Sequence, residues 1–302
     1  MSDFQCIISE ESEEERIDKF ISDEVEGLSR SYIQTLLKDQ KIFVNMKPVK
    51  SSYRLRAGDE ITFSIPEATS PEIVPEDIPL SILFEDKDLL IVNKPKGMVV
   101  HPAAGHYTGT LVNAVMFHCK DDLSGINGVL RPGIVHRIDR DTTGSLIICK
   151  NDASHKSIAE QLKMHSVTRK YRAIVHGVVK EDSGTIDAPI GRHPNDRKRM
   201  AINQKNGKQA VTHYKVLERF RNCTYIECEL ETGRTHQIRV HMSSIGHPLL
   251  GDSVYSGKSE TKLTGQTLHA MIIGFQHPST GEYMEFEAPL PEYFETLLKT
   301  LK

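Results

Sequence analysis

A short segment at 136–144 contains the side chains of this chain that are best suited to do chemistry. It reads His-Arg-Ile-Asp-Arg-Asp-Thr-Thr-Gly, so the carboxylate of Asp139 follows two basic side chains. The apolar run at 146–149 is typical of a short buried strand, and Gly144 offers the backbone freedom that a tight turn into it needs. A carboxylate at a strand edge among Arg and His is a candidate nucleophile or base. The alternative is a structural Asp that pairs with Arg137.

A second polar block occupies residues 231–242 and reads Glu-Thr-Gly-Arg-Thr-His-Gln-Ile-Arg-Val-His-Met. If the block is extended, Arg239 and His241 share one face of the strand, and Arg234 and His236 share the other. The two histidines then point in opposite directions, so we expect no metal site here. The sequence also has no Gly-x-Gly-x-x-Gly motif, and we expect no cofactor.

Composition limits the classes of protein to which the chain can belong. No apolar run approaches the roughly 20 residues of a membrane-spanning helix, and the acidic N-terminus has no signal-peptide pattern. The five Cys are scattered, without a Cys-x-x-Cys pair, which argues against a disulfide framework and fits a reducing cytoplasm. The net charge is only -3, but a local basic surface can still bind nucleic acid.

Composition shifts divide the chain into four parts. We expect a disordered acidic tail at 1–14, a small α/β domain at 15–65, a Pro-rich linker at 66–79 and a large α+β domain at 80–302. The large domain should contain a mixed, mainly antiparallel sheet. The elements predicted from hydrophobic spacing are helices near 17–25, 29–37, 111–118 and 153–164, and strands near 41–49, 60–65, 88–93, 169–178, 210–220, 224–231 and 268–288.

The segment around Asp139 resembles the catalytic motif of the RluA/RluD-class pseudouridine synthases of the ribosomal large subunit. That motif reads His-Arg-Leu-Asp, two variable residues, then Thr-Ser-Gly, and this chain departs from it only at Ile138 and Thr143. Further matching segments follow in the family's order: Lys94-Pro95, Lys170-Tyr171, Thr-Gly-Arg-Thr-His-Gln-Ile-Arg at 232–239, Leu268-His269-Ala270 and His277-Pro278. The domain at 15–65 contains Arg16-Ile17-Asp18-Lys19-Phe20, Ser29-Arg30, a Val44-Asn45 turn and Ala57-Gly58-Asp59. With these features it resembles the RNA-binding domain of ribosomal protein S-four, here called S4.

This resemblance implies the pseudouridine synthase fold and the conversion of uridine to pseudouridine within RNA. Asp139 would attack C1′ of the ribose, or act as the base in a glycal route. Arg239 would pair with Asp139, keep it ionised and fix its direction. Tyr171 would stack on the uracil and accept the proton from C5, and Arg137 would enter the space left by the flipped nucleotide.

Other basic residues are candidates for phosphate contact. Arg234 and His236 would brace the catalytic loop or meet the RNA backbone. Four cations fall in the polar, Pro-interrupted stretch 191–200, which we interpret as a loop or hairpin tip, and two more lie in the small domain. The candidates of these two groups are Arg192, Arg197, Lys198, Arg199, Arg30 and Lys41.

Several alternatives stay open at this point. A non-catalytic RNA-binding or ribosome-assembly protein would need only the basic surface, and an N-glycosidase would share a carboxylate beside C1′ but release the base. Large-subunit ribosomal RNA is the expected substrate and transfer RNA the alternative. We expect a cytoplasmic monomer. The sequence does not identify the target uridine or say whether the N-terminal domain is essential.

Overall fold

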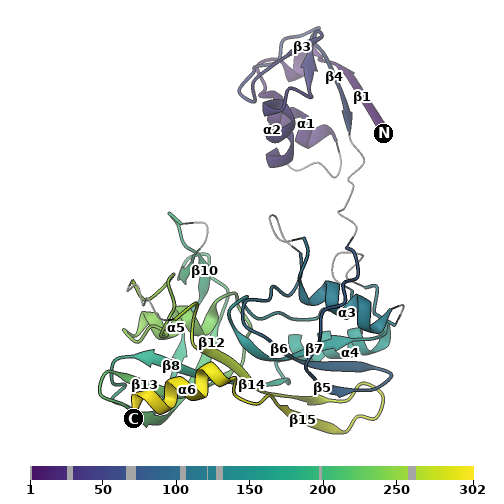
Figure 1. The fold of residues 1–302 in the computed structure, drawn as a ribbon. Coiled ribbons are helices and arrows are strands. Elements are labelled where there is room, and N and C mark those ends of the chain that lie inside the picture. The colour runs from purple at the N-terminus through teal and green to yellow at the C-terminus, as the bar shows by residue number, and fades with distance from the viewer. Residues whose placement is uncertain are drawn as a thin grey trace. The chain divides into compact units, whose positions relative to one another are not determined.

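The structure, a computed structural model, describes residues 2–25, 30–65, 73–102, 107–120, 122–126, 132–196, 199–257 and 263–302 of the 302-residue chain. The chain divides into two compact units, Met1–Pro71 and Glu72–Lys302, which are drawn in Figure 1. Each unit has a hydrophobic core of its own, so we describe them separately.

The first unit packs two helices against a four-stranded antiparallel sheet with the strand order β1-β4-β2-β3. Asn45 and Met46 both have positive φ (50° and 60°), as a two-residue hairpin turn of the primed type requires. The elements are β1 (Ser2–Ile7), a 3-10 turn (Glu10–Ser12), α1 (Ile17–Glu24), α2 (Arg30–Lys38), β2 (Phe43–Val44), β3 (Lys47–Pro48) and β4 (Glu60–Ile65).

The acidic N-terminus is not the disordered tail that we expected for residues 1–14. Strand β1 pairs along its whole length with β4, and the ring of Phe4 lies 4.9 Å from that of Phe63. Phe4, Cys6 and Ile8 alternate with polar or exposed residues, and Ile8 is fully in the core. This period of two is a strand signal, but the run of glutamates after it dominates the composition of the segment.

The second unit is built on a nine-stranded sheet in the order β5-β6-β7-β14-β8-β13-β12-β9, with β15 added beside β14. All described pairs are antiparallel except β7 with β14, so the expected mixed, mainly antiparallel α+β fold is confirmed. The strands are β5 (Ile82–Glu85), β6 (Leu89–Lys94), β7 (Thr143–Cys149), β8 (Thr168–His176), β9 (Ser183–Asp187), β12 (Val211–Arg219), β13 (Cys223–Leu230), β14 (Leu268–Gln276) and β15 (Tyr283–Glu287).

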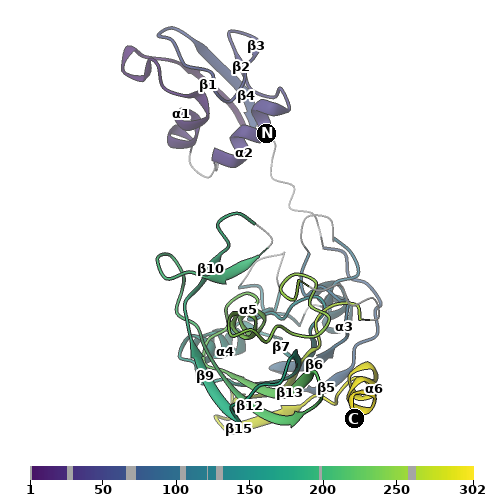
Figure 2. The same ribbon diagram turned by 90° about the vertical axis from the view of Figure 1, so that its left-hand side faces the viewer.

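Four helices and a separate hairpin complete this unit, and alternation along the strands decides which helix covers which face. Leu90 and Val92 of β6 share a core with α3 and α5, whereas Leu89 and Ile91 face α4. In Figure 2 the strands form an arc, and α5 lies inside it. The elements are α3 (Leu111–Cys119), α4 (Asp152–Lys163), α5 (Gln237–Ser244), α6 (Glu292–Leu301), and the hairpin of β10 (Ile190–Arg192) and β11 (Met200–Ile202).

The predicted elements of the large domain are found within a few residues, apart from the polar block at 231–242. Residues 66–72 of the expected linker lie outside the described residues. Its other half is not a free spacer: Ile73 is buried in the core, and the side chain of Asn113 in α3 donates to the carbonyl of Val74 at 2.8 Å. The four prolines suggested an extended segment, but the buried Ile73 and the bond from Asn113 attach it to the second unit.

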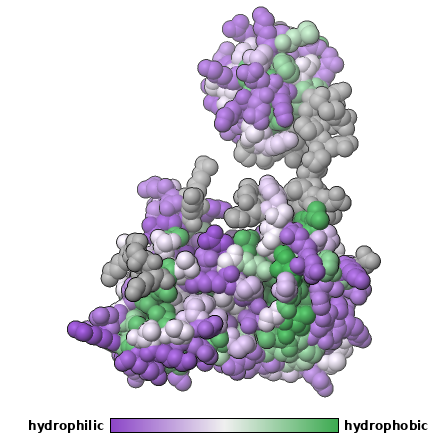
Figure 3. Space-filling view, viewed as in Figure 1, coloured by the Kyte–Doolittle hydropathy of each residue, from purple (hydrophilic) through white to green (hydrophobic). Residues whose placement is uncertain are grey.

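Within the described residues, no helix combines the length and the apolar character that crossing a membrane needs. The face of the first unit that is seen in Figure 3 is mainly hydrophilic. On the second unit, hydrophobic residues gather toward the side of α3 and β5, while the rest of this face is mixed.

Gly144 is needed for a close approach of two strands, not for a turn before a strand as we expected. Strand β7 already begins at Thr143, and Gly144 pairs with Ala270 of the parallel neighbour β14. Its φ is +110°, and a Cβ at this position would lie 2.2 Å from the carbonyl oxygen of Ala270. The catalytic-motif segment therefore joins the sheet through a contact that only glycine permits.

We expect Gly144→Ala to destabilise the second unit by more than about 3 kcal/mol, because the added methyl group forces the two strands apart in a strained backbone conformation. Gly281→Ala is the matched control: its φ is also positive (+71°), but nothing lies within 4 Å of the added Cβ. It should cost only about 1 kcal/mol. Denaturant unfolding of the three proteins measures both, and equal losses would contradict the role given to Gly144.

Candidate functional site

Asp139 lies in the loop before β7 and faces a cavity that is lined by the loop, by strands β8, β13 and β14, and by the segment that leads into α5. The side chain of Asp139 is 18% exposed, so it can meet a ligand from this cavity. The lining residues are Arg137, Ile138, Asp139, Thr142, Tyr171, Leu230, Arg234, His236, Gln237, Ile238, Arg239 and Leu268. The residues predicted from both sequence blocks therefore meet at one place.

Arg239 holds the Asp139 carboxylate. It projects from α5, and its Nη1 donates to Oδ2 of Asp139 at 2.9 Å. The guanidinium is almost completely buried, with 6% of the side chain exposed. Burial disfavours its charge, but the hydrogen bonds and charges of Asp252 and Asp139 outweigh this effect and raise the pKa of Arg239. A permanently charged donor is thus fixed beside the carboxylate, as expected from the resemblance.

Asp252 is the second partner of Arg239, and sequence reasoning gave it no role. Its carboxylate is fully buried and accepts two hydrogen bonds from Arg239, from Nε at 2.7 Å and from Nη2 at 2.9 Å. Oδ1 of Asp252 also accepts the backbone N–H groups of Val254 and Tyr255. This bidentate pair fixes the plane of the guanidinium and leaves Nη1 for Asp139. The Gly-Asp pair at 251–252 follows the predicted block, but no spacing rule connects it to Arg239.

The polar block is a helix where we expected a strand. Gln237 starts α5, and His236 before it has φ +59°, in the left-handed region. The side-chain oxygen of Gln237 accepts from the N–H of Arg234 and from the hydroxyl of Thr232, which fastens the turn into the helix. Our prediction that His236 and His241 lie on opposite faces of a strand was therefore wrong in its premise. They still diverge, because His241 bonds with Thr212 and with the carbonyl of Ala188 on the other side of α5.

Lys94, on which we placed no catalytic role, supports the loop from inside the unit. Its side chain is 1% exposed, and Nζ donates to the carbonyl oxygens of Pro95, Met98 and Arg140 at 2.8 to 2.9 Å. Burial lowers the pKa of Lys94 to about 7, against the effect of the nearby loop carboxylates. Since Arg140 directly follows Asp139, this lysine fixes the backbone that carries the candidate nucleophile.

His136 is a structural member of the motif. Its Nε2 accepts the backbone N–H of Ile147 at 3.0 Å, and burial lowers the pKa of His136 to about 3. A neutral ring that already accepts a hydrogen bond ties the loop to β7 and has no free proton to donate from that nitrogen.

Tyr171 is buried in β8 and lines the cavity, as predicted for a residue that stacks on a base. Burial raises the pKa of Tyr171, and the Asp139 charge adds to the shift while Arg169 opposes it. The phenol is therefore protonated at neutral pH. The stacking and proton-acceptor roles that we expected for Tyr171 both stay predictions.

The structure separates the expected RNA-contact residues into three places. Arg137 and Arg234 line the cavity beside Asp139, where Nε of Arg234 donates to the carbonyl of Gln209 at 2.9 Å. Strands β10 and β11 pair on either side of the basic stretch, as expected for a hairpin, with Arg192 exposed and Arg199 half-buried. Arg197 and Lys198 lie outside the described residues. Arg30 and Lys41 belong to the first unit, and both are exposed.

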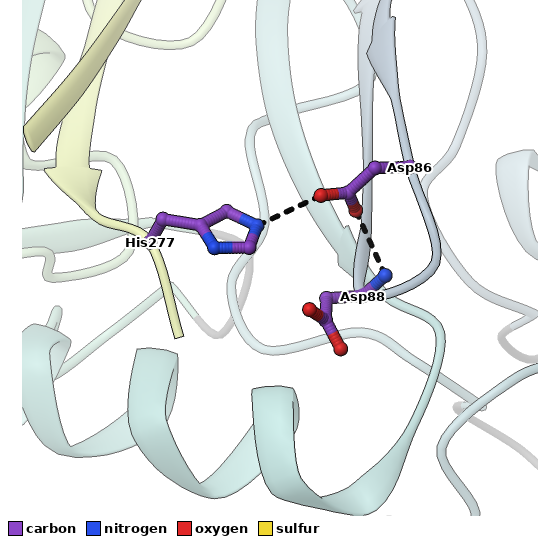
Figure 4. Close-up of side chains that lie close together, drawn as sticks. All are labelled: Asp86, Asp88 and His277. Atoms are coloured by element: carbon purple, nitrogen blue, oxygen red, sulfur yellow. Dashed lines mark hydrogen bonds and ion pairs between the residues drawn. The ribbon is translucent and has the colours of Figure 1, made fainter. Parts of the chain in front are cut away.

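Among the described residues, one group has the composition of a metal site. Asp86, Asp88 and His277 lie together, as Figure 4 shows. Their atoms are already used: His277 Nε2 lies 2.8 Å from an Asp86 oxygen, and its Nδ1 accepts backbone N–H groups from Ser279 and Thr280. With no lone pair left on the imidazole, the group is better explained as a tie between the β5–β6 and β14–β15 turns. None of its members lines the cavity at Asp139.

Comparison with known proteins agrees with this geometry. The family described as RNA pseudouridylate synthase matches residues 88–244, and the S4 domain matches residues 15–61. The RNA pseudouridine synthase YlyB of Bacillus subtilis is 53% identical over the whole of this chain and 99% of its own length. The ribosomal large subunit pseudouridine synthase D of Zymomonas mobilis is 45% identical over 98% of this chain and 97% of its own length.

A solved structure, human RNA pseudouridylate synthase domain containing 1, superposes with a TM-score of 0.58 at 25% identity, and the match covers 75% of this chain and 96% of that one. The relatives match over nearly the full length of the chain, and the family match spans the Asp139 loop, Tyr171 and Arg239. This chain belongs to the RNA pseudouridine synthase family and has an N-terminal S4 domain.

Proposed function

We propose that this enzyme isomerises specific uridines in large-subunit ribosomal RNA and that Asp139 is its catalytic carboxylate. The observation that supports the role of Asp139 most directly is its ion pair with the buried Arg239 at the edge of the cavity. The substrate is inferred from relatives that are named ribosomal large subunit pseudouridine synthase D, and an S4 domain is suited to hold structured RNA.

The reaction breaks the N1–C1′ bond, rotates the uracil and joins C5 to C1′, so the base gains a proton at N1 and loses one at C5. It needs no external group and no change of oxidation state, and we propose that the enzyme works without a cofactor. Asp139 attacks C1′ and leaves again, or removes a ribose proton to form a glycal. Arg239 keeps the carboxylate ionised and fixes its direction.

The remaining lining residues are assigned to binding. Tyr171 stacks on the flipped uracil, and Arg137 takes the space that the nucleotide leaves. Arg234 and the β10–β11 hairpin contact backbone phosphates, with Arg30 and Lys41 doing so in the S4 domain. We propose a monomer that acts in the cytoplasm, where ribosomal RNA is matured.

The central experiment maps pseudouridine in total RNA from cells with and without this protein, with the wild-type or an Asp139→Ala gene returned. Loss of one or a few sites in 23S-type RNA, restored by wild type alone, is the expected result. Rescue by Asp139→Ala would leave a binding or assembly role. Release of free uracil from a purified RNA substrate would identify an N-glycosidase instead.

Asp139→Asn should lower turnover at least about a thousandfold, because the amide keeps the shape of the side chain but not its charge or nucleophilicity. Thermal unfolding and RNA affinity should stay close to wild type. Single-turnover assays measure the loss of turnover, with enzyme in excess over the RNA and at concentrations above the Kd. Turnover within tenfold of wild type would remove Asp139 as the essential residue.

Asp252→Asn should lower kcat by about tenfold or more with little change in RNA affinity, because the guanidinium of Arg239 loses one charged partner and its fixed plane. Asp141→Asn is a matched control in the same loop as Asp139, since that carboxylate pairs with the exposed Arg140 instead. If both variants lose activity equally, the effect lies in the loop as a whole and not in the support of Arg239.

Tyr171→Phe should keep most of the activity, whereas Tyr171→Ala should lose it, because the ring and not the hydroxyl group provides the stacking surface. Steady-state kinetics on the mapped RNA site compare the two variants. A Tyr171→Phe variant as inactive as Tyr171→Ala would restore the proton-acceptor role of the hydroxyl group.

A further inference from the structure

Tyr255 connects the basic hairpin to the Asp139 site, and neither its sequence context nor the family comparison gives it a role. It follows Asp252 in the chain and is 8% exposed. Its hydroxyl oxygen accepts the backbone N–H of Met200, the first residue of β11, at 2.9 Å. The same oxygen lies 2.9 Å from Nδ1 of His236.

The contact with Met200 constrains the Tyr255 hydroxyl group. The backbone N–H of Met200 can only donate, so it occupies one lone pair of the phenol oxygen, and the O–H of Tyr255 needs an acceptor. Nδ1 of His236 is in range, and an O–H that donates to it would satisfy both groups. A neutral imidazole that accepts at Nδ1 carries its proton on Nε2.

The Nε2 atom of His236 points toward Asp139. It lies 3.8 Å from Oδ1, while the other oxygen, Oδ2, accepts from Arg239 at 2.9 Å. The two carboxylate oxygens thus face different donors, one charged and close, the other neutral and slightly too far for a hydrogen bond. Catalytic hydrogen bonds of this kind are often long before substrate binds and shorten in the complex.

His236 is held in this orientation at a conformational cost. Its φ of +59° is in the left-handed region, which is unfavourable for a residue with a Cβ. Burial lowers the pKa of His236 and keeps the ring neutral, although Asp139 and Asp252 oppose this shift and Arg239 and Arg137 add to it. Strain at a position that lines the cavity fits a residue that must present one particular nitrogen.

The aromatic ring of Tyr255 is also in contact with charged and aromatic side chains. The guanidinium carbon of Arg239 lies 5.0 Å from its centroid and that of Arg199 lies 5.4 Å from it, so one ring contacts the Asp139 partner and the base of the RNA-contact hairpin. The His236 ring meets it edge-on, with centroids 5.7 Å apart. The ring that carries the hydroxyl group is therefore held by three contacts.

We propose that Tyr255 and His236 act as positioning residues for Asp139: the Tyr255 hydroxyl sets the His236 tautomer, so that an Nε2–H donor faces Oδ1 and directs that oxygen toward the ribose. This assignment rests on the proposed function of Asp139. It also makes the hairpin part of the site, because the Met200 N–H fixes the direction of the phenol proton.

The tautomer is measured directly by long-range ¹H–¹⁵N NMR of protein labelled at its 14 histidines, with the His236 signals identified by their loss in His236→Gln. We expect the Nε2–H form at neutral pH in the wild type and a shift toward the Nδ1–H form or a mixture in Tyr255→Phe. A wild-type His236 in the Nδ1–H form, or as imidazolium, would overturn the proposal. This readout does not depend on turnover.

Kinetics test the consequence for the reaction. Tyr255→Phe keeps the ring between the two arginines and should lower kcat about tenfold with KM unchanged, the size expected for one hydrogen bond that aligns a reacting group. Tyr283→Phe is the control, since it removes a hydroxyl group from an exposed tyrosine on β15 that bonds to Thr168 and Glu285. Thermal unfolding of both variants identifies a general loss of structure.

The possible outcomes separate the two proposals. A Tyr255→Phe variant that is folded, with a changed tautomer and a reduced kcat, supports the positioning pair. Wild-type kcat in that variant, or a reduced kcat with an unchanged tautomer, overturns it. Turnover by Asp139→Asn would instead overturn the proposed role of Asp139, whatever the tautomer of His236 is.

Discussion

One guanidinium shared between two carboxylates determines the arrangement of this site. Arg239 is buried, and a buried charge is stable only when it is paired and hydrogen-bonded. Asp252 pairs with the guanidinium through two buried hydrogen bonds, and Asp139 pairs with it from the side of the cavity. Because Asp252 is completely buried and Asp139 is not, the same guanidinium pairs with a carboxylate in the interior and with one that faces the cavity.

The ion pair requires a rigid framework, since α5 and the Asp139 loop come from segments 100 residues apart. The loop is fixed from the sheet by the buried ammonium of Lys94 and by the glycine contact between β7 and β14. The helix is fixed by Gln237, whose amide also donates to the carbonyl of Val211 in β12. Tyr171 lies in strand β8 of the same sheet and lines the same cavity, so its ring and the Asp139 carboxylate are held by one framework.

The sequence contained most of the catalytic candidates but only part of the reason for their arrangement. Asp139, Arg239 and Tyr171 could be identified because their motifs are local and match a family in order. We analysed the block around Arg239 as an alternating strand, and this was wrong. Its polar residues would lie on both faces of a strand, and such a pattern also fits a helix whose polar side chains form hydrogen bonds in the interior. Asp252 and Tyr255 were not predicted as site residues because their partners are distant in sequence. Strand β1 escaped because the neighbouring glutamates masked three alternating apolar residues.

The charges and protons of the cavity limit where the proton from C5 can go. The guanidinium of Arg239 has a raised pKa and cannot accept it, and the Tyr171 phenol is already protonated at neutral pH. His236, in the tautomer proposed above, has Nε2–H toward the cavity and its other nitrogen bonded to Tyr255. If the proposed function holds, the carboxylate of Asp139 is the described lining group that could take this proton after its step at the ribose, by either route. A single aspartate would then serve first at the ribose and afterwards as the base, with water as the final acceptor.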